Sequence, residues 1–116
     1  MRSRVFLTAA LIASAVPGPS AEAQSDSAVR SLLRTADSAF VVGDRAVARG
    51  AYREVVRRDS SASSRAVYRL AVFLAEDGDF RDAIALHLHY TALEPNDMEG
   101  ELGLARTYAW AGRTDD

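Results

Sequence analysis

Three glycines divide the chain at nearly equal intervals, and this spacing constrains the fold more than any other feature of the sequence. They are Gly43, Gly78 and Gly112, and a polar residue follows each of them. Two helical patterns fit between successive glycines. A period of about 34 residues with two helices per unit is typical of stacked helical hairpins. The sequence therefore predicts an all-α solenoid of antiparallel helix hairpins.

Hydrophobic periodicity and capping residues place five helices along the chain. No segment alternates cleanly between apolar and polar residues, so no strand is expected. The helices are expected at residues 27–42, 45–58, 64–76, 80–93 and 97–111, with Gly112 ending the last one. We expect Ser25 or Asp26 to cap the first helix and Asp79 the fourth. Asn96 is expected to cap the fifth helix, in a capping box with Glu99.

Short loops make consecutive helices antiparallel neighbours, and each helix has an apolar face. The residues expected on these inward faces are Val29, Leu32, Leu33, Ala36, Phe40, Val47, Ala48, Ala51, Tyr52, Val55, Val56, Val67, Leu70, Ala71, Leu74, Phe80, Ala83, Ile84, Leu86, His87, Tyr90, Leu102, Leu104, Ala105, Tyr108 and Trp110. We expect no sixth helix to cover the fifth, so Leu104, Tyr108 and Trp110 cannot all be buried. Exposed apolar patches of this kind mark interfaces, and this C-terminal edge is a candidate for self-association.

Residues 1–23 have the features of a secretory signal peptide. Arg2 and Arg4 give a positive start, an apolar run spans positions 5–16, and positions 21–23 form a small-x-small cleavage site. A membrane-spanning helix needs about 20 apolar residues, so this run is too short to span a bilayer. We expect cleavage after Ala23 and export to the periplasm or association with the outer membrane. The mature repeat domain then comprises residues 24–116.

Composition and motifs argue against several classes of function. The net charge of −2 argues against a nucleic-acid-binding surface. Without cysteine the chain has no disulfide, thiolate metal site or cysteine nucleophile. His87 and His89 point about 200° apart on one helix, so they cannot share a metal ion. No catalytic serine motif, phosphate loop or dinucleotide motif is present, so we expect no enzymatic activity, metal or cofactor.

The residues between Ser64 and Asp97 follow the pattern of a known helical repeat. Large and small apolar residues, a turn and a final proline stand at fixed places: Val67, Leu70, Ala71, Leu74, Gly78-Asp79-Phe80, Ala83 and Pro95. This unit resembles the tetratricopeptide repeat (TPR) family. His87 replaces an aromatic residue of the family pattern and Tyr90 replaces an alanine, which leaves the packing of the fourth helix open.

Two weaker units flank this one. The unit at residues 29–63 matches at Leu32, Ala36, Gly43, Ala48 and Tyr52. The unit at residues 98–116 matches at Leu104, Ala105, Tyr108 and Gly112, and the sequence stops before its second helix. The resemblance implies a right-handed α-solenoid of about two and a half repeats.

In the TPR family the first helix of each unit lines a concave face that binds partners. Carried over to this chain, that face comprises Arg30, Leu33, Asp37, Phe40, Arg65, Tyr68, Val72, Glu99, Leu102, Arg106 and Trp110. Arginine, tyrosine and tryptophan often anchor interfaces. The alternative is that these side chains only pack between repeats or face water.

Some TPR proteins clamp the C-terminal carboxylate of a peptide with asparagine and basic residues. Arg65 and Arg69 stand at two of the basic positions. The positions of the clamp asparagines are occupied here by Asp37, Val72 and Arg106. We therefore do not expect this mode of binding.

The resemblance implies a non-catalytic, exported scaffold that binds a protein or peptide of unidentified nature on its concave face. An alternative is that the chain is the N-terminal repeat segment of a larger outer-membrane export protein. Residues 102–113 support this alternative, because they are similar to repeats that precede the β-barrel in YaiO-like and cellulose-export-type bacterial proteins.

Overall fold

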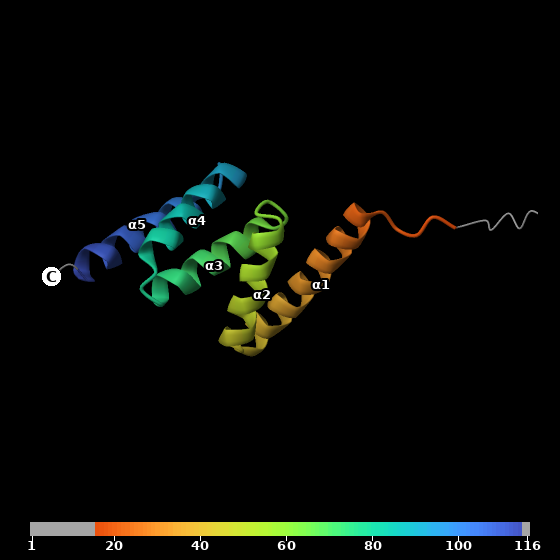
Figure 1. Ribbon diagram of the computed structural model, residues 1–116. Helices are drawn as coiled ribbons and strands as arrows, with labels where there is room; N and C mark the ends of the chain where they lie inside the picture. The colour runs from red at the N-terminus through yellow and green to blue at the C-terminus, as the bar shows by residue number, and fades with distance from the viewer. Residues whose placement is uncertain (1–15, 115–116) are drawn as a thin grey trace, which may run out of the picture.

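The computed structural model describes residues 16–114 of the chain, and its regular structure is entirely helical (Figure 1). Five helices follow one another: α1 (Ala21–Val42), α2 (Arg45–Arg58), α3 (Ser64–Glu76), α4 (Phe80–Leu93) and α5 (Met98–Thr114). No strand occurs within the described range. The predicted all-α class is confirmed, and the predicted bounds of α2, α3 and α4 are correct.

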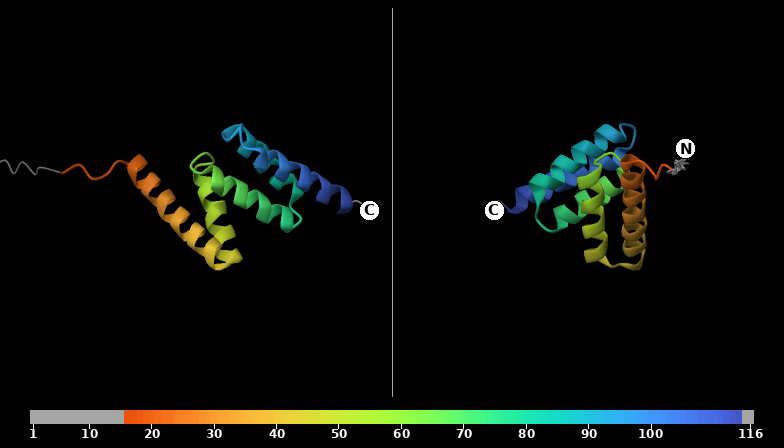
Figure 2. Two further views of the ribbon diagram at one scale, coloured as in Figure 1. Left: turned by 180° about the vertical axis from the view of Figure 1, so that it is seen from behind. Right: turned by 45° about the vertical axis from the view of Figure 1, so that its right-hand side comes forward.

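Each helix packs against the helix that follows it in the chain, and α3 also contacts α5. The array therefore runs from α1 at one end to α5 at the other (Figures 1 and 2). This arrangement follows from the short connections, which allow successive helices only to fold back on one another.

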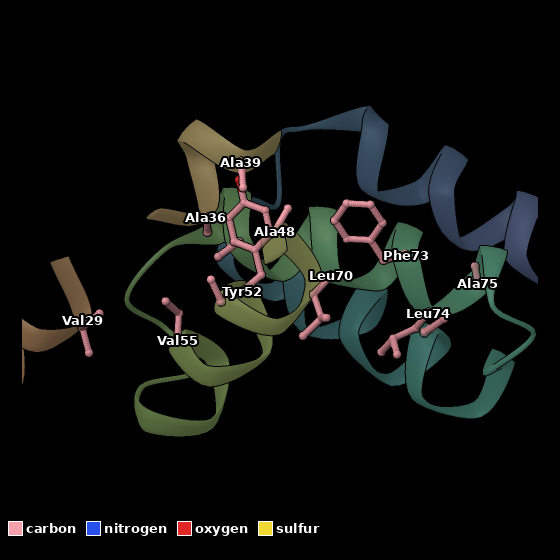
Figure 3. Close-up of a cluster of buried hydrophobic side chains, with 13 residues drawn as sticks. Val29, Ala36, Ala39, Ala48, Tyr52, Val55, Leu70, Phe73, Leu74 and Ala75 are labelled. Carbon is pink, nitrogen blue, oxygen red and sulfur yellow. The ribbon is translucent and has the colours of Figure 1, made fainter. Parts of the chain in front are cut away.

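The main core lies where α1, α2 and α3 meet (Figure 3). Ala36 and Ala48 are fully buried, and these small side chains let α1 and α2 approach closely. Tyr52 and Val55 fill the space beside them without any exposure to solvent. Four residues expected to face inward from α3 are all buried: Val67, Leu70, Ala71 and Leu74.

Left-handed glycines end α1 and α3. Gly43 has φ 81° and Gly78 has φ 84°, a conformation that only glycine adopts at little cost. An aspartate follows each of them, and Asp44 caps α2 by accepting a hydrogen bond from the Val47 amide at 3.3 Å. Gly112 does not act in this way, because α5 continues through it to Thr114. Arg113, which follows it, has no acceptor with which to cap another helix.

The start of α1 differs from the expectation. The helix begins at Ala21 and not near residue 27, and Ser20 caps it by accepting from the Ala23 amide at 3.2 Å. The added turns contain alanine, glutamate and glutamine, which favour helix, although residues 21–27 are all exposed. Residues 1–15 of the predicted signal peptide lie outside the described range. Cleavage after Ala23 stays a prediction.

Two expected helix caps are corrected. Asp97, and not Asn96, caps α5, since its Oδ1 accepts from the Glu99 amide at 3.0 Å. Asp79 stands at the N-cap of α4 but makes no side-chain capping bond.

Some residues expected to face inward are exposed. Val47 is 45% exposed, because the buried face of α2 begins only at Ala48. Leu102 and Tyr108 are each 53% exposed, and Ala105 is exposed as well. The buried positions of α5 are instead Gly100, Gly103 and Thr107, so its packed face is rotated away from its large apolar residues.

Two glycines on α5 receive two rings of α4. A Cβ added at Gly103 would lie 2.6 Å from Cε1 of His87, and one added at Gly100 would lie 2.7 Å from Cδ1 of Tyr90. The Tyr90 hydroxyl also donates to Asp97, which raises the pKa of Tyr90 to about 12. The rings that depart from the TPR pattern on α4 are therefore accommodated by small residues on the next helix.

We expect Gly103→Ala to destabilise the protein by about 1–3 kcal/mol, because the added methyl group would collide with the buried His87 ring. The matched control is Gly50→Ala in α2, where nothing lies within 4 Å of the added Cβ. That variant should gain about 0.5–1 kcal/mol from the lower flexibility of alanine. Urea unfolding of both variants measures the difference, and equal stabilities would contradict the close contact of α4 with α5.

Candidate functional site

One cavity brings together three residues that the sequence assigned to a concave face. Phe40, Tyr68 and Val72 line an open cavity of about 250 Å³. Its other lining residues are Arg45, Arg69, Phe73 and Glu76. We call this cavity the α1–α3 groove, because residues of α1 and α3 form most of its wall.

Arg69, which lines the groove, is held by a hydrogen-bonded network centred on Asp37. Its Oδ1 accepts from the Tyr52 hydroxyl at 2.5 Å and from Nη1 of Arg69 at 3.2 Å. Its Oδ2 accepts from Nη2 of Arg65 at 2.6 Å. Arg69 also donates to the Tyr52 hydroxyl oxygen at 2.6 Å. Burial, followed by the hydrogen bond to Asp37, raises the pKa of Tyr52, so its hydroxyl stays protonated.

Aromatic contacts then hold the walls of the groove. The Arg69 guanidinium lies 3.8 Å from the centre of the Phe40 ring, a favourable cation–π contact. Phe40 meets Phe73 edge to face, with ring centres 6.2 Å apart. The Arg45 guanidinium lies 4.9 Å from the centre of the Phe73 ring, and Arg45 also forms an ion pair with Glu76. Phe40 nevertheless remains 40% exposed, so the groove presents an aromatic surface on a rigid base.

Tyr68 also lines the groove, and its ring packs against α4. Its ring lies 5.7 Å from the His87 ring and 5.1 Å from the Tyr90 ring, measured between centres. Tyr68 is only half-buried. An aromatic side chain fixed in this way contributes contact area at little cost in entropy.

The face continues toward α5. Val72, Arg106 and Trp110 line a narrow cavity next to His87. Trp110 also lines a wider cavity of about 410 Å³ together with Glu76, which borders the α1–α3 groove as well. Residues from α1, α3 and α5 thus share one side of the array.

Other predicted residues of the face are not brought into these cavities. Arg30 and Glu99 are exposed and line neither the groove nor the cavities at Trp110. Leu33 is half-buried at the edge of the main core, and Leu102 is exposed on the far side of α5. Arg65 and Asp37 line none of these cavities and belong to the network that holds Arg69.

Three groove residues were missed by the sequence analysis. Phe73 stands three residues after Leu70, and that helical spacing was a usable signal for a buried position. Arg45 comes from the start of α2, and Glu76 from the last turn of α3. Nothing in a single sequence reports that these two ends pair across the groove.

The carboxylate-clamp positions are occupied within the chain. Arg65 and Arg69 both donate to Asp37, so an internal carboxylate already occupies both guanidinium groups. A peptide carboxylate would have to displace this internal carboxylate, which disfavours that mode of binding.

The two histidines have separate surroundings. His87 is 1% exposed, and its Nδ1 has no hydrogen-bond partner in the described part of the chain. Burial, with a smaller contribution from nearby Arg106, lowers the pKa of His87, so the ring is neutral at pH 7. His89 instead donates from Nε2 to the Ser60 carbonyl at 2.7 Å. Among residues 16–114, no group of three or more potential metal ligands lies close together.

Comparison of the chain with models of protein families, with curated proteins and with solved structures finds no match. No helix in the described range has the length and apolar character needed to cross a membrane.

We expect Asp37→Asn to destabilise the protein by roughly 1–3 kcal/mol, since it leaves the half-buried Arg69 without its anion. Combining it with Tyr52→Phe in a double-mutant cycle should give a coupling free energy of about 0.5–3 kcal/mol. Glu54→Gln is the control, because Glu54 pairs only with exposed Arg57 and Arg58 on the same helix and should matter little. Additive effects of the first two substitutions would contradict the network.

We expect the free energy of unfolding to fall as the pH drops through 6.5, the ordinary pKa of histidine. Folding lowers the pKa of His87 below its ordinary value. As the pH falls, the unfolded chain therefore binds a proton at His87 before the folded chain does, and this stabilises the unfolded state relative to the folded state. The decline ends below the folded pKa. His87→Gln should remove this dependence and His89→Gln should leave it. Urea titrations at pH about 7.5 and about 5.5 measure it, and an unchanged slope in His87→Gln would refute the assignment.

Proposed function

We propose that this chain is an exported, TPR-type helical scaffold that binds an extended or helical peptide segment of a partner protein along the α1–α3 groove. The scaffold is non-catalytic in this proposal. The observation that carries it is the convergence of Phe40, Tyr68 and Val72 on one open groove. These residues were assigned to a binding face from their places in the repeat pattern alone.

The composition of the groove supports a peptide ligand. Aromatic and arginine side chains dominate its lining, and these residue types most often anchor protein interfaces. Arg69 is held by Asp37, Tyr52 and the Phe40 ring, so little ordering would be needed on binding. Preorganised sites lose less entropy when they bind.

The charge state of the groove selects the chemistry of the ligand. Arg45 pairs with Glu76, and Arg69 shares the Asp37 carboxylate with Arg65, so each groove arginine already has an anionic partner. Because both groove arginines already have an anionic partner, the remaining exposed surface of the groove is mostly apolar and suits apolar side chains of a ligand. We therefore propose recognition led by an aromatic or aliphatic side chain that rests between Phe40 and Tyr68.

Export rests on the segment 1–23, with its positive start, apolar run and small-x-small site. The absence of cysteine suits an oxidising compartment, because no thiol is left to mispair. We accordingly place the proposed partner outside the cytoplasm.

A displayed library of random peptides, selected on the immobilised protein, tests the proposal. We expect enriched peptides to contain an aromatic or aliphatic anchor. Val72→Arg should weaken their binding at least about tenfold, because it places a charge within the groove. Affinities are measured by fluorescence anisotropy of labelled peptides.

The control is Leu88→Ala, which removes an exposed apolar side chain on α4 that lines none of the cavities at the face. Selected peptides should bind this variant as they bind the unaltered protein. Circular dichroism verifies that both variants remain helical. Peptides that bind Val72→Arg with full affinity, or a selection that enriches none, would count against the groove as a binding site.

A further inference from the structure

The side of α5 that points away from α4 carries a regular stripe of apolar and small residues. The stripe comprises Met98, Leu102, Ala105, Ala109 and Gly112, and we call it the outer α5 stripe. The intervals between its members alternate between four positions and three, which is the spacing of the core positions of a coiled coil. Met98 is 73% exposed and Leu102 is 53% exposed, so two large apolar side chains face water.

The contacts of α5 within the array use its other side. Gly100, Gly103 and Thr107 are the buried residues of α5, and the two glycines receive the rings of α4. Trp110 lines the cavities toward α3. Of the three residues expected at an open edge, Leu104 and Trp110 are half-buried and Tyr108 is 53% exposed.

We propose that the outer α5 stripe pairs with the same stripe of a second copy of this chain, with the two helices antiparallel. In this register Met98 lies opposite Ala109 of the second copy, and Leu102 lies opposite its Ala105. The two-fold axis repeats both pairs, so each of four layers joins one large and one small side chain. Such alternation fills an interface without voids.

The same shape argument sets the direction. In a parallel pair, Met98 and Leu102 of both copies would crowd one end, and the alanines would leave a gap at the other. The antiparallel register removes both defects. It also satisfies the requirement that a two-fold interface be complementary to itself.

Charged residues beside the stripe fit this register. Glu99 and Arg106 flank the stripe on the edge where Arg106 also borders the narrow cavity beside His87, and antiparallel pairing places Glu99 of each copy beside Arg106 of the other. Glu101 and Tyr108 flank the other edge, where the Tyr108 hydroxyl can donate to the Glu101 carboxylate across the interface. Within residues 16–114, none of these four side chains forms an ion pair or side-chain hydrogen bond. Tyr108 is 53% exposed.

The interface would be small, since one helix from each copy forms it. Interfaces of this size fall at the weak end of specific association. We therefore expect a dimer with a dissociation constant in the micromolar range, visible as a concentration-dependent mass.

Sedimentation equilibrium of the full chain over a range of concentrations tests the proposal. We expect a monomer–dimer equilibrium. Glu99→Arg or Arg106→Glu alone should raise the dissociation constant about tenfold or more, because each creates two like-charge pairs. The combined variant, with both charges exchanged, should restore dimerisation.

The matched control is Arg30→Glu, a charge reversal at an exposed residue of α1 that should leave the dimer unchanged. Leu102→Lys should give a monomer, and circular dichroism checks that each variant keeps its helix content. A monomer at every concentration would overturn the proposal. So would a dimer that ignores the charge reversals at 99 and 106, or a combined variant that binds no better than the single ones.

Discussion

The carboxylate of Asp37 joins three helices, and much of the structure depends on that one group. It lies on α1, accepts from Tyr52 on α2 and accepts from Arg65 and Arg69 on α3. Apolar packing brings α1, α2 and α3 together in one core, but packing is not directional and does not by itself fix how α3 is placed against the other two helices. Directional bonds to a half-buried carboxylate do fix it, since hydrogen bonds to charged groups are the stronger ones. The α1–α3 groove exists because Arg69, held in this way, supports the Phe40 ring.

The bounds of the inner helices could be predicted from the sequence, whereas the outer ends of α1 and α5 could not. The bounds of α2, α3 and α4 were predictable because glycine with aspartate, a serine-capped start and Pro95 mark them chemically. The first turns of α1 and the last turn of α5 have few contacts, so local preference alone decides them. Gly112 misled the prediction, because a glycine ends a helix only where the residues after it support a turn.

The candidate site was partly predictable for a related reason. Helical spacing puts Phe40, Tyr68 and Val72 on one side of the array, and the repeat pattern indicates which side. It does not indicate that Arg65 and Arg69 already share an anionic partner, because that partner, Asp37, lies on a different helix, far away in sequence. It also does not reveal the ion pair between Arg45 and Glu76, because that pair depends on the angle at which α2 packs against α3.

The two glycines on α5 have a further consequence for the geometry of the whole chain. In most helix pairs, rows of side chains on both partners set the interaxial angle. Here the rings of His87 and Tyr90 rest on bare backbone, so the sizes of two rings act as spacers between α4 and α5. The contacts on the buried side of α5 therefore set the orientation of this helix relative to α4. A change of ring size at positions 87 and 90 would therefore alter the orientation of the exposed surface of α5 without replacing any residue of that surface.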